Sequence, residues 1–112
     1  MKKSLILGFV FAGILGSNLN ASCTKTGCTD KINTIYVTST GKILVGTDGN
    51  EKALNCAGGG VSGVYVSVNQ NAKGANQIYS LLLTAKSMGK KVKLRIVEGS
   101  KYCDISYATL AD

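Results

Sequence analysis

Two stretches in the first half of the chain have the composition of β-strands. Residues 32–38 and 42–46 are rich in β-branched and aromatic residues, and Ser39-Thr40-Gly41 between them has the composition of a tight turn. Strand segments joined by a short glycine-containing turn are typical of a β-hairpin. The sequence therefore predicts a hairpin here, followed by a second turn at Asp48-Gly49-Asn50.

A third strand is predicted just after a glycine-rich segment at 58–63. Three valines alternate there with a tyrosine and a serine, in the order Val64-Tyr65-Val66-Ser67-Val68. This two-residue period is typical of a strand with one buried face, so we expect the valines in the core and the other two side chains outside. The glycine-rich segment fits the pattern G-x-G-x-x-G, but a dinucleotide site requires a helix after the glycines. We expect a loop instead.

One helix is predicted, from about Asn76 to Met88. Its apolar side chains repeat at the helical period and fall on one stripe, formed by Ile78, Leu81, Leu82, Ala85 and Met88. Asn76 has a side chain suited to capping the helix N-terminus, and Gly89 can end the helix in the left-handed conformation. We expect the stripe to pack on a sheet, and a membrane-active or partner-binding amphipathic helix is the alternative.

Two further strands are predicted after the helix. Residues 91–96 alternate between apolar and cationic side chains, so one face is expected in the core. The opposite face carries three cations that we call the basic stripe: Lys91, Lys93 and Arg95. Residues 105–110 supply a last strand. The order of three strands, a helix and two strands predicts an α+β fold, a small antiparallel and partly open barrel with one helix packed on it.

The first 21 residues have the pattern of an export signal. Lys2 and Lys3 form a positively charged start, residues 5–15 form an uncharged apolar run, and Leu19-Asn20-Ala21 is a suitable cleavage site. The apolar run is short for a membrane span, and a transmembrane anchor is the alternative. We therefore expect a signal peptide at 1–21, a single domain at 22–112, and a secreted or periplasmic location.

All four cysteines follow the predicted signal, at Cys23, Cys28, Cys56 and Cys103. A domain of this size buries a limited core, and small exported domains are commonly stabilised by disulfides. Four cysteines allow three pairings, of which we favour Cys23 with Cys28 and Cys56 with Cys103. The alternatives are lipidation of Cys23 and a zinc site, which the isolated positions of Cys56 and Cys103 disfavour. No metal or cofactor is therefore expected.

The chain contains no histidine, which excludes histidine-activated nucleophiles and imidazole metal ligands. A Ser-Lys pair or two carboxylates are the catalytic alternatives that remain. The six carboxylates fall mostly in turn-like or terminal stretches, where we expect them on the solvated surface: Asp30, Asp48, Glu51, Glu98, Asp104 and Asp112. The protein is therefore not expected to be an enzyme.

The charge of the chain favours anionic partners. The formal net charge of +7 becomes 7 − 2 = +5 once Lys2 and Lys3 leave with the signal. The basic stripe suits sialylated glycans, anionic lipid or nucleic acid, although stacking aromatics would normally accompany a nucleic-acid site, so we expect no nucleic acid. Five tyrosines, including Tyr36 and Tyr65 on predicted strands, suit sugar contacts or interfaces. An ordinary solvated sheet surface is the favoured interpretation of both features, and ligand contact is the alternative.

Three segments resemble a known protein family: Thr29-Asp30-Lys31-Ile32, Ile78-Tyr79-Ser80-Leu81-Leu82, and residues 89–96. Together they are similar to the small B subunits of pertussis-like and subtilase-type bacterial toxins. The resemblance implies an oligonucleotide/oligosaccharide-binding (OB) barrel, a homo-oligomeric ring of five and binding of sialylated glycans. It also implies a separate catalytic toxin subunit as a partner.

The resemblance extends to one pair of site residues. Members of that family place a Ser-Asp pair just before the first strand, and the serine hydroxyl contacts the sugar. Thr29 and Asp30 resemble this pair, with a threonine that keeps the hydroxyl and adds a methyl group. The resemblance therefore implies a glycan site at Thr29 and Asp30.

Two hypotheses from different functional classes follow. The leading one is an exported, non-enzymatic, disulfide-stabilised binding module, oligomeric in solution, that recognises glycans around Thr29 and Asp30. The alternative is a periplasmic structural or inhibitor-like protein whose basic stripe docks an acidic protein partner.

Overall fold

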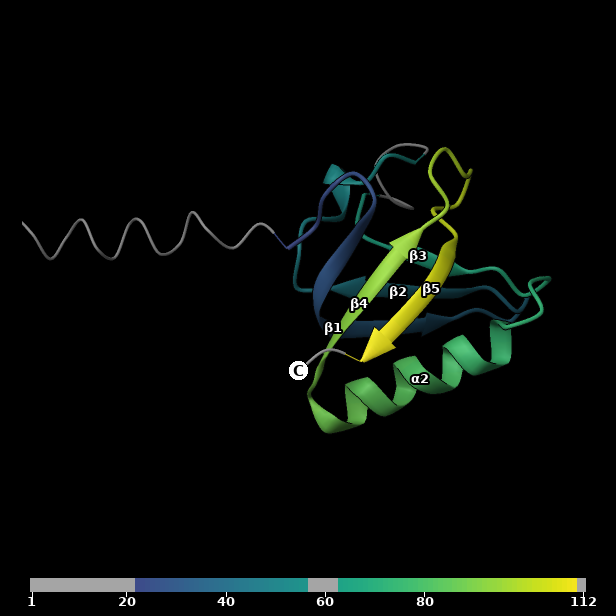
Figure 1. The fold of residues 1–112 in the computed structure, drawn as a ribbon. Helices are drawn as coiled ribbons and strands as arrows, with labels where there is room; N and C mark the ends of the chain where they lie inside the picture. Colours follow the sequence, from purple (N-terminus) through teal and green to yellow (C-terminus); the bar gives the residue numbers. More distant parts are fainter. Residues whose placement is uncertain (1–21, 57–62, 111–112) are drawn as a thin grey trace, which may run out of the picture.

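The computed structural model describes residues 22–56 and 63–110, so the predicted signal peptide and most of the glycine-rich segment lie outside the described residues. The elements run in the predicted order of three strands, a helix and two strands (Figure 1). They are β1 (Gly27–Val37), β2 (Ile43–Thr47), the 3₁₀ turn η1 (Glu51–Ala53), β3 (Val66–Val68), α2 (Ala75–Met88), β4 (Lys91–Ile96) and β5 (Ile105–Leu110). The largest difference from the prediction is that β1 begins at Gly27 rather than at residue 32.

The five strands form one sheet in the order β3-β2-β1-β4-β5, with antiparallel neighbours. β1 pairs with two neighbouring strands: residues 27–31 pair with β4 and residues 32–37 pair with β2. A register shift between Ile32 and Thr34 accompanies the change of partner, and such bulges bend a strand. A parallel bridge from Ser67 of β3 to Asp104, just before β5, joins the two edges. The result is the expected small α+β fold, a partly open OB-like barrel.

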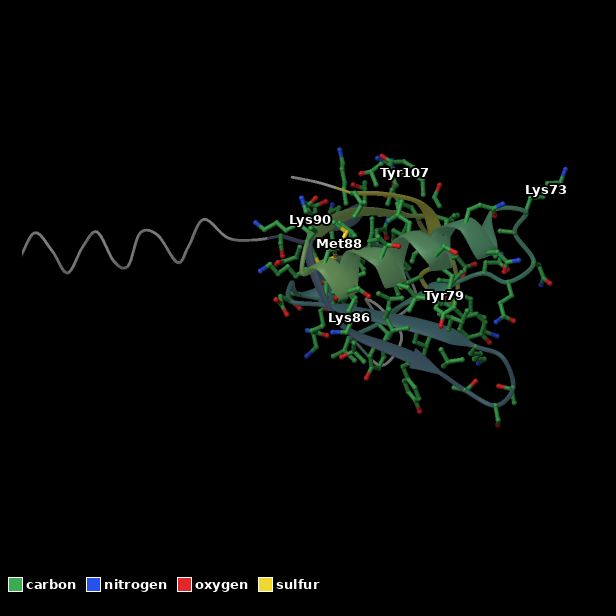
Figure 2. All side chains as sticks on the ribbon, turned by 90° about the horizontal axis from the view of Figure 1, so that it is seen from below. Lys73, Tyr79, Lys86, Met88, Lys90 and Tyr107 are labelled. Atoms are coloured by element: carbon green, nitrogen blue, oxygen red, sulfur yellow. A yellow bond between two sulfur atoms is a disulfide. The ribbon has the colours of Figure 1, made fainter. Side chains whose placement is uncertain are left out.

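The helix α2 lies along the lower end of the barrel in Figure 1 and packs against β1, β3, β4 and β5. The side chains that it packs on the sheet include Ala75, Ile78, Leu82 and Ala85, and the last two are fully buried. The sequence places Met88 on this stripe as well, and that prediction is wrong. After Ala85 the stripe continues to position 89, so Met88 lies beside it and is 55% exposed (Figure 2).

The two ends of α2 differ in how well the sequence predicts them. Gly89 ends the helix as expected, because its φ of 64° is left-handed and its N–H reaches the carbonyls of Ala85 and Lys86. At the start, Gly74 occupies the capping position and no side chain caps the helix. Asn76 lies inside the first turn, so the predicted Asn76 cap is wrong. Within the described ranges, no helix has the length and apolar character needed to cross a membrane.

β4 and β3 differ in how closely they follow the predicted alternation. β4 alternates strictly, with its three apolar side chains buried and the basic stripe exposed. β3 is buried on both faces, and Ser67 is only 8% exposed. The expectation that Ser67 lies outside is therefore wrong. The segment before β5 covers this face of β3, and the Ser67 hydroxyl donates a hydrogen bond to the Tyr102 carbonyl at 2.9 Å.

Both disulfides have the favoured pairing. Cys23 is bonded to Cys28 at a sequence separation of 5, and Cys56 is bonded to Cys103 at a separation of 47. The second bond ties the chain just after η1 to the residues before β5, where Cys103 is fully buried. Crosslinks of this kind supply stability that a small core lacks. They also fit an oxidising extracellular or periplasmic compartment.

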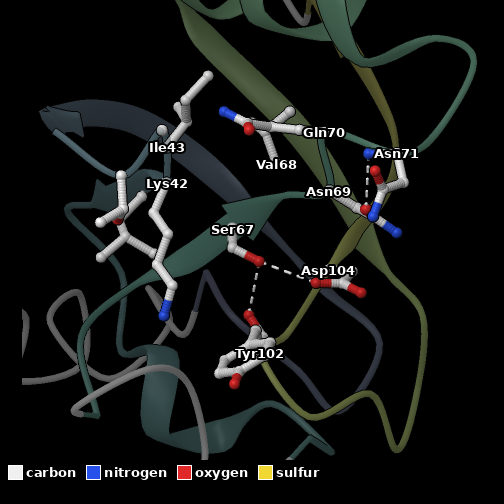
Figure 3. Close-up of a pocket in the computed structure, with 12 residues that line it drawn as sticks. Lys42, Ile43, Ser67, Val68, Asn69, Gln70, Asn71, Tyr102 and Asp104 are labelled. Atoms are coloured by element: carbon white, nitrogen blue, oxygen red, sulfur yellow. Dashed lines mark hydrogen bonds between the residues drawn. The ribbon is translucent and has the colours of Figure 1, made fainter. Parts of the chain in front are cut away.

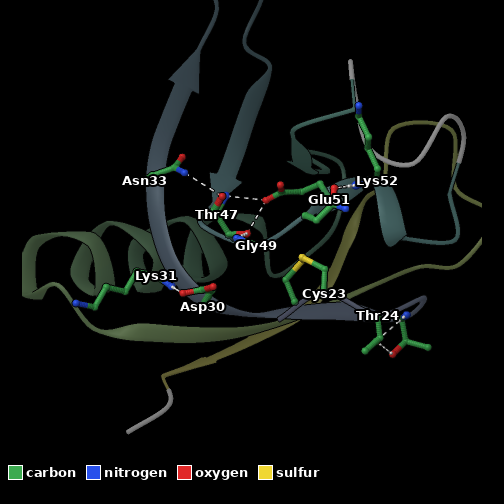
Figure 4. Close-up of a disulfide and its surroundings, with 12 residues drawn as sticks. Cys23, Thr24, Asp30, Lys31, Asn33, Thr47, Gly49, Glu51 and Lys52 are labelled. Atoms are coloured by element: carbon green, nitrogen blue, oxygen red, sulfur yellow. Dashed lines mark hydrogen bonds between the residues drawn. A yellow bond between two sulfur atoms is a disulfide. The ribbon is translucent and has the colours of Figure 1, made fainter. Parts of the chain in front are cut away.

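Glu51 departs from the expectation that the carboxylates are solvated, because its side chain is 3% exposed. The turn after β2 leads directly into η1, which folds Glu51 back toward the end of β2 (Figure 4). Its Oε2 accepts hydrogen bonds from the Thr47 backbone N–H at 2.7 Å and from the Thr47 hydroxyl at 2.5 Å. The prediction of a solvated Glu51 is therefore wrong, and the residue acts as an internal hydrogen-bond acceptor.

Candidate functional site

The pairing of β1 with β4 brings part of the predicted glycan site next to the basic stripe. Thr29 lies directly opposite Lys93, and Gly27 lies opposite Arg95. Side chains of residues paired in this way point to the same face of the sheet. The Thr29 hydroxyl and the cations, which stand far apart in the sequence, therefore share the outer face of β1 and β4.

Asp30 does not share this face. It lies opposite Val92, which is fully buried, so its side chain points to the other side of the strand. Its carboxylate accepts a hydrogen bond from the Lys31 backbone N–H at 2.8 Å (Figure 4). The structure thus brings Thr29 to the basic stripe and turns Asp30 away from it.

β5 extends the outer face on the far side of β4. Tyr107 lies opposite Arg95, and Thr109 lies opposite Lys93. Both side chains are exposed, and Tyr107 is labelled in Figure 2. The sequence reasoning missed both residues, because simple alternation from the buried Ile105 would turn them inward. A register shift in the pairing of β4 with β5, between Arg95 and Ile96, reverses that direction.

A groove with a cavity volume of about 210 Å³ lies on this outer face, and we call it the outer groove. Its lining includes four hydroxyl side chains, two cations and one phenol: Ser22, Thr24, Thr26, Thr29, Lys93, Arg95 and Tyr107. Gly27 also lines it, and a Cβ atom at this position would collide with the Leu94 carbonyl oxygen of β4. The close approach of the two strands therefore requires glycine there.

The protein itself engages the cations of the outer groove only weakly. Arg95 has one acidic neighbour, Glu98, at 4.0 Å, and both side chains are nearly half exposed. Exposed ion pairs of this kind contribute little stability. Within the described residues, Lys93 has no carboxylate at ion-pair distance. Both cations are therefore free to bind an anionic group, next to hydroxyls that can donate and accept hydrogen bonds.

One cluster in the described part of the chain has the composition of a metal site. The sulfur atoms of Cys23 and Cys28 and a carboxylate oxygen of Glu51 lie within 4.8 Å of one another. The two sulfurs are joined in a disulfide, whereas metals bind the thiolate form. The oxidised protein therefore offers no sulfur ligand here, and the cluster is structural.

Comparisons with known proteins assign no family to this chain. It matches no protein-family model, no curated protein and no solved structure.

Proposed function

We propose that the protein is an exported, non-enzymatic binding module whose outer groove recognises an acidic, sialylated glycan. The observation that carries the proposal is the register that sets Thr29 beside Lys93, next to Arg95 and Tyr107. A sialic acid combines a carboxylate with several hydroxyls. The two cations complement the carboxylate, the threonine hydroxyls complement the sugar hydroxyls, and the Tyr107 ring offers a flat apolar surface.

The composition of the outer groove favours a glycan over a simple anion. A simple anion requires only positive charge, whereas this groove combines two cations with four hydroxyl side chains. Its volume of about 210 Å³ lies below the range of about 300–1,000 Å³ that is usual for drug-sized ligands. We therefore expect it to hold a single terminal sugar with modest affinity.

Modest affinity at one groove fits the ring of five that the toxin resemblance implies. Several copies of a weak site on one assembly bind a glycan-covered surface by avidity. Native mass spectrometry of the exported protein is therefore expected to show an assembly of five mature chains. A catalytic subunit would be a further partner of such a ring. A monomer at all concentrations tested would contradict the oligomeric part of the proposal.

Replacing Lys93 by glutamine is expected to weaken the binding of sialyllactose by about tenfold or more. A hydrogen bond to a charged group contributes about 1.5–3 kcal/mol, and glutamine loses the charge. Thr29→Val keeps the shape of the side chain but removes the hydroxyl, so we expect a loss of a few-fold. Titration calorimetry with the oxidised protein measures both effects.

Lys86→Gln is the matched control, because it makes the same charge change on the exposed side of α2 (Figure 2). It should leave sialyllactose binding unchanged, and lactose, which has no carboxylate, should bind the wild type far more weakly. Equal losses of sialyllactose affinity from Lys86→Gln and Lys93→Gln would contradict the assignment of the binding site to the outer groove. A different result would support docking of an acidic protein partner by the basic stripe instead. In that case the folded wild type binds no glycan but co-purifies with an acidic protein, and the Lys93→Glu variant loses that protein.

A further inference from the structure

A second cavity lies between the turn that joins β1 to β2, strand β3 and the segment before β5 (Figure 3). Its volume is about 340 Å³, and it shares no lining residue with the outer groove. Its lining includes three apolar residues of β2 and β3, Ile43, Leu44 and Val68, together with charged, amide and aromatic residues. We call this cavity the hairpin pocket.

Asp104 supplies a fixed carboxylate to the hairpin pocket. Its backbone N–H donates to the Ser100 hydroxyl at 2.9 Å, and its Oδ1 lies 2.9 Å from the hydroxyl of the buried Ser67, whose single proton is shared between this carboxylate and the Tyr102 carbonyl (Figure 3). Within the described residues Asp104 forms no ion pair, and Oδ2 has no hydrogen-bond partner. A carboxylate can accept several hydrogen bonds, so Oδ2 remains available to a ligand.

Lys42 and Tyr102 form the cationic and aromatic side of the hairpin pocket. The Lys42 ammonium lies 4.8 Å from the centroid of the Tyr102 ring, toward which it extends in Figure 3. The Lys101 ammonium lies 5.4 Å from the same centroid, so two cations share the Tyr102 ring, which is 43% exposed, and of the two Lys42 belongs to the pocket lining. The pocket therefore carries one positive and one negative group that are not paired with each other.

Amide side chains complete the rim. The Oδ1 of Asn69 accepts a hydrogen bond from the Asn71 backbone N–H at 2.9 Å, which orients the amide. The Gln70 side chain lies against Gly41 of the hairpin turn, whose φ of 93° favours glycine. A Cβ at Gly41 would lie 3.2 Å from the Gln70 Oε1. The turn and the segment after β3 are therefore in close contact, which defines this edge of the pocket.

We propose that the hairpin pocket binds a neutral sugar. The two charged residues that line it, Lys42 and Asp104, have opposite signs, so the lining itself carries no net charge. A carboxylate acceptor beside amide donors matches the neighbouring hydroxyls of a pyranose, and the exposed Tyr102 ring offers a flat apolar surface to its C–H face. The volume of about 340 Å³ falls within the range of about 300–1,000 Å³ that is usual for ligand sites. This site is additional to the acidic-glycan site and does not depend on it.

The test is an NMR titration of the isotope-labelled, oxidised protein with four neutral probes: methyl α-mannoside, methyl β-galactoside, methyl β-glucoside and N-acetylglucosamine. At least one probe should cause saturable shifts of the backbone amide signals of Gly41, Gln70, Asn71 and Asp104. Asp104→Asn keeps an oxygen for the Ser67 hydroxyl but removes the charge. It is expected to weaken binding by about tenfold, the effect of losing a hydrogen bond to a charged group.

Gln70→Ala is a second variant that leaves the core intact, because Gln70 is exposed. It should lower the affinity for the same probe by a few-fold. Lys93→Gln should weaken the binding of sialyllactose but leave the shifts caused by the neutral probe unchanged. The two binding proposals can therefore fail separately. The hairpin-pocket proposal would be overturned if none of the four probes shifts these signals. It would also be overturned if Asp104→Asn and Gln70→Ala both bind the active probe as the wild type does.

Discussion

Replacing Cys56 and Cys103 together by alanine is expected to lower the free energy of unfolding by about 4 kcal/mol. The two cysteines are 47 residues apart. In the chain-entropy account, a crosslink over this length lowers the entropy of the unfolded chain and so raises its free energy by about 4 kcal/mol. The bond also ties the residues before β5, which contact β3 through Ser67, to the chain just after η1. Chemical denaturation of the oxidised variant and wild type, followed by circular dichroism, measures the difference.

The other disulfide provides a matched comparison. Cys23 and Cys28 are 5 residues apart, so the same account gives a loss of about 2 kcal/mol for their double alanine variant. The order of the two losses is the discriminating result. An equal loss, or a larger one from the Cys23 and Cys28 variant, would show that the loop length does not set the stabilisation. Either loss is a large share of the 5–15 kcal/mol that is typical of a folded domain.

The strands and the helix could be predicted because they depend on local periods in the sequence. β4 is the clearest case, since its apolar and cationic residues alternate along the chain and the structure buries and exposes them in the same order. The end of α2 is equally local, because Gly89 is the residue that can adopt the left-handed conformation at that point. Such signals need no knowledge of which segments become neighbours.

Other features depend on how distant segments pair, and the sequence did not predict them. Ser67 is buried because the residues before β5 cover it. Tyr107 points outward because of a register shift in the pairing of β4 with β5. Glu51 lies in a stretch with the composition of an exposed turn, yet η1 folds its carboxylate onto Thr47. In each case a contact between separate segments overrides the local pattern.

The candidate site was partly predictable for the same reason. Thr29 and the basic stripe stand out in the sequence, but only the register of β1 with β4 shows that Thr29 and Lys93 are neighbours. That register exists because β1 begins at Gly27, in a stretch of threonines, glycine and cysteine that lacks a clear strand pattern. The same geometry turns Asp30 to the opposite face, which the pair motif in the sequence did not indicate.

Replacing Glu51 by alanine is expected to lower the free energy of unfolding by about 3 kcal/mol. The variant leaves the backbone N–H and the hydroxyl of Thr47 without their acceptor, and Thr47 is only 4% exposed. An unsatisfied buried polar group costs about 1–3 kcal/mol, and the alanine also leaves a space beside the Cys23–Cys28 disulfide. Glu51→Gln keeps an acceptor oxygen and should cost less, about 1 kcal/mol. Thermal and chemical denaturation measure both changes.

Asp48→Ala is the control for Glu51→Ala, because it removes a carboxylate from the same turn. Asp48 is exposed and accepts a hydrogen bond from the Asn33 side chain at 3.1 Å, so its loss should cost less than about 1 kcal/mol. A loss from Asp48→Ala as large as that from Glu51→Ala would show that the buried acceptor has no special role. If Glu51→Ala is the costlier change, the carboxylate is a structural support for the disulfide-linked segment that lines the outer groove. Its effect on sialyllactose binding would then follow from loosening of that segment, and Glu51→Gln should restore most of the affinity.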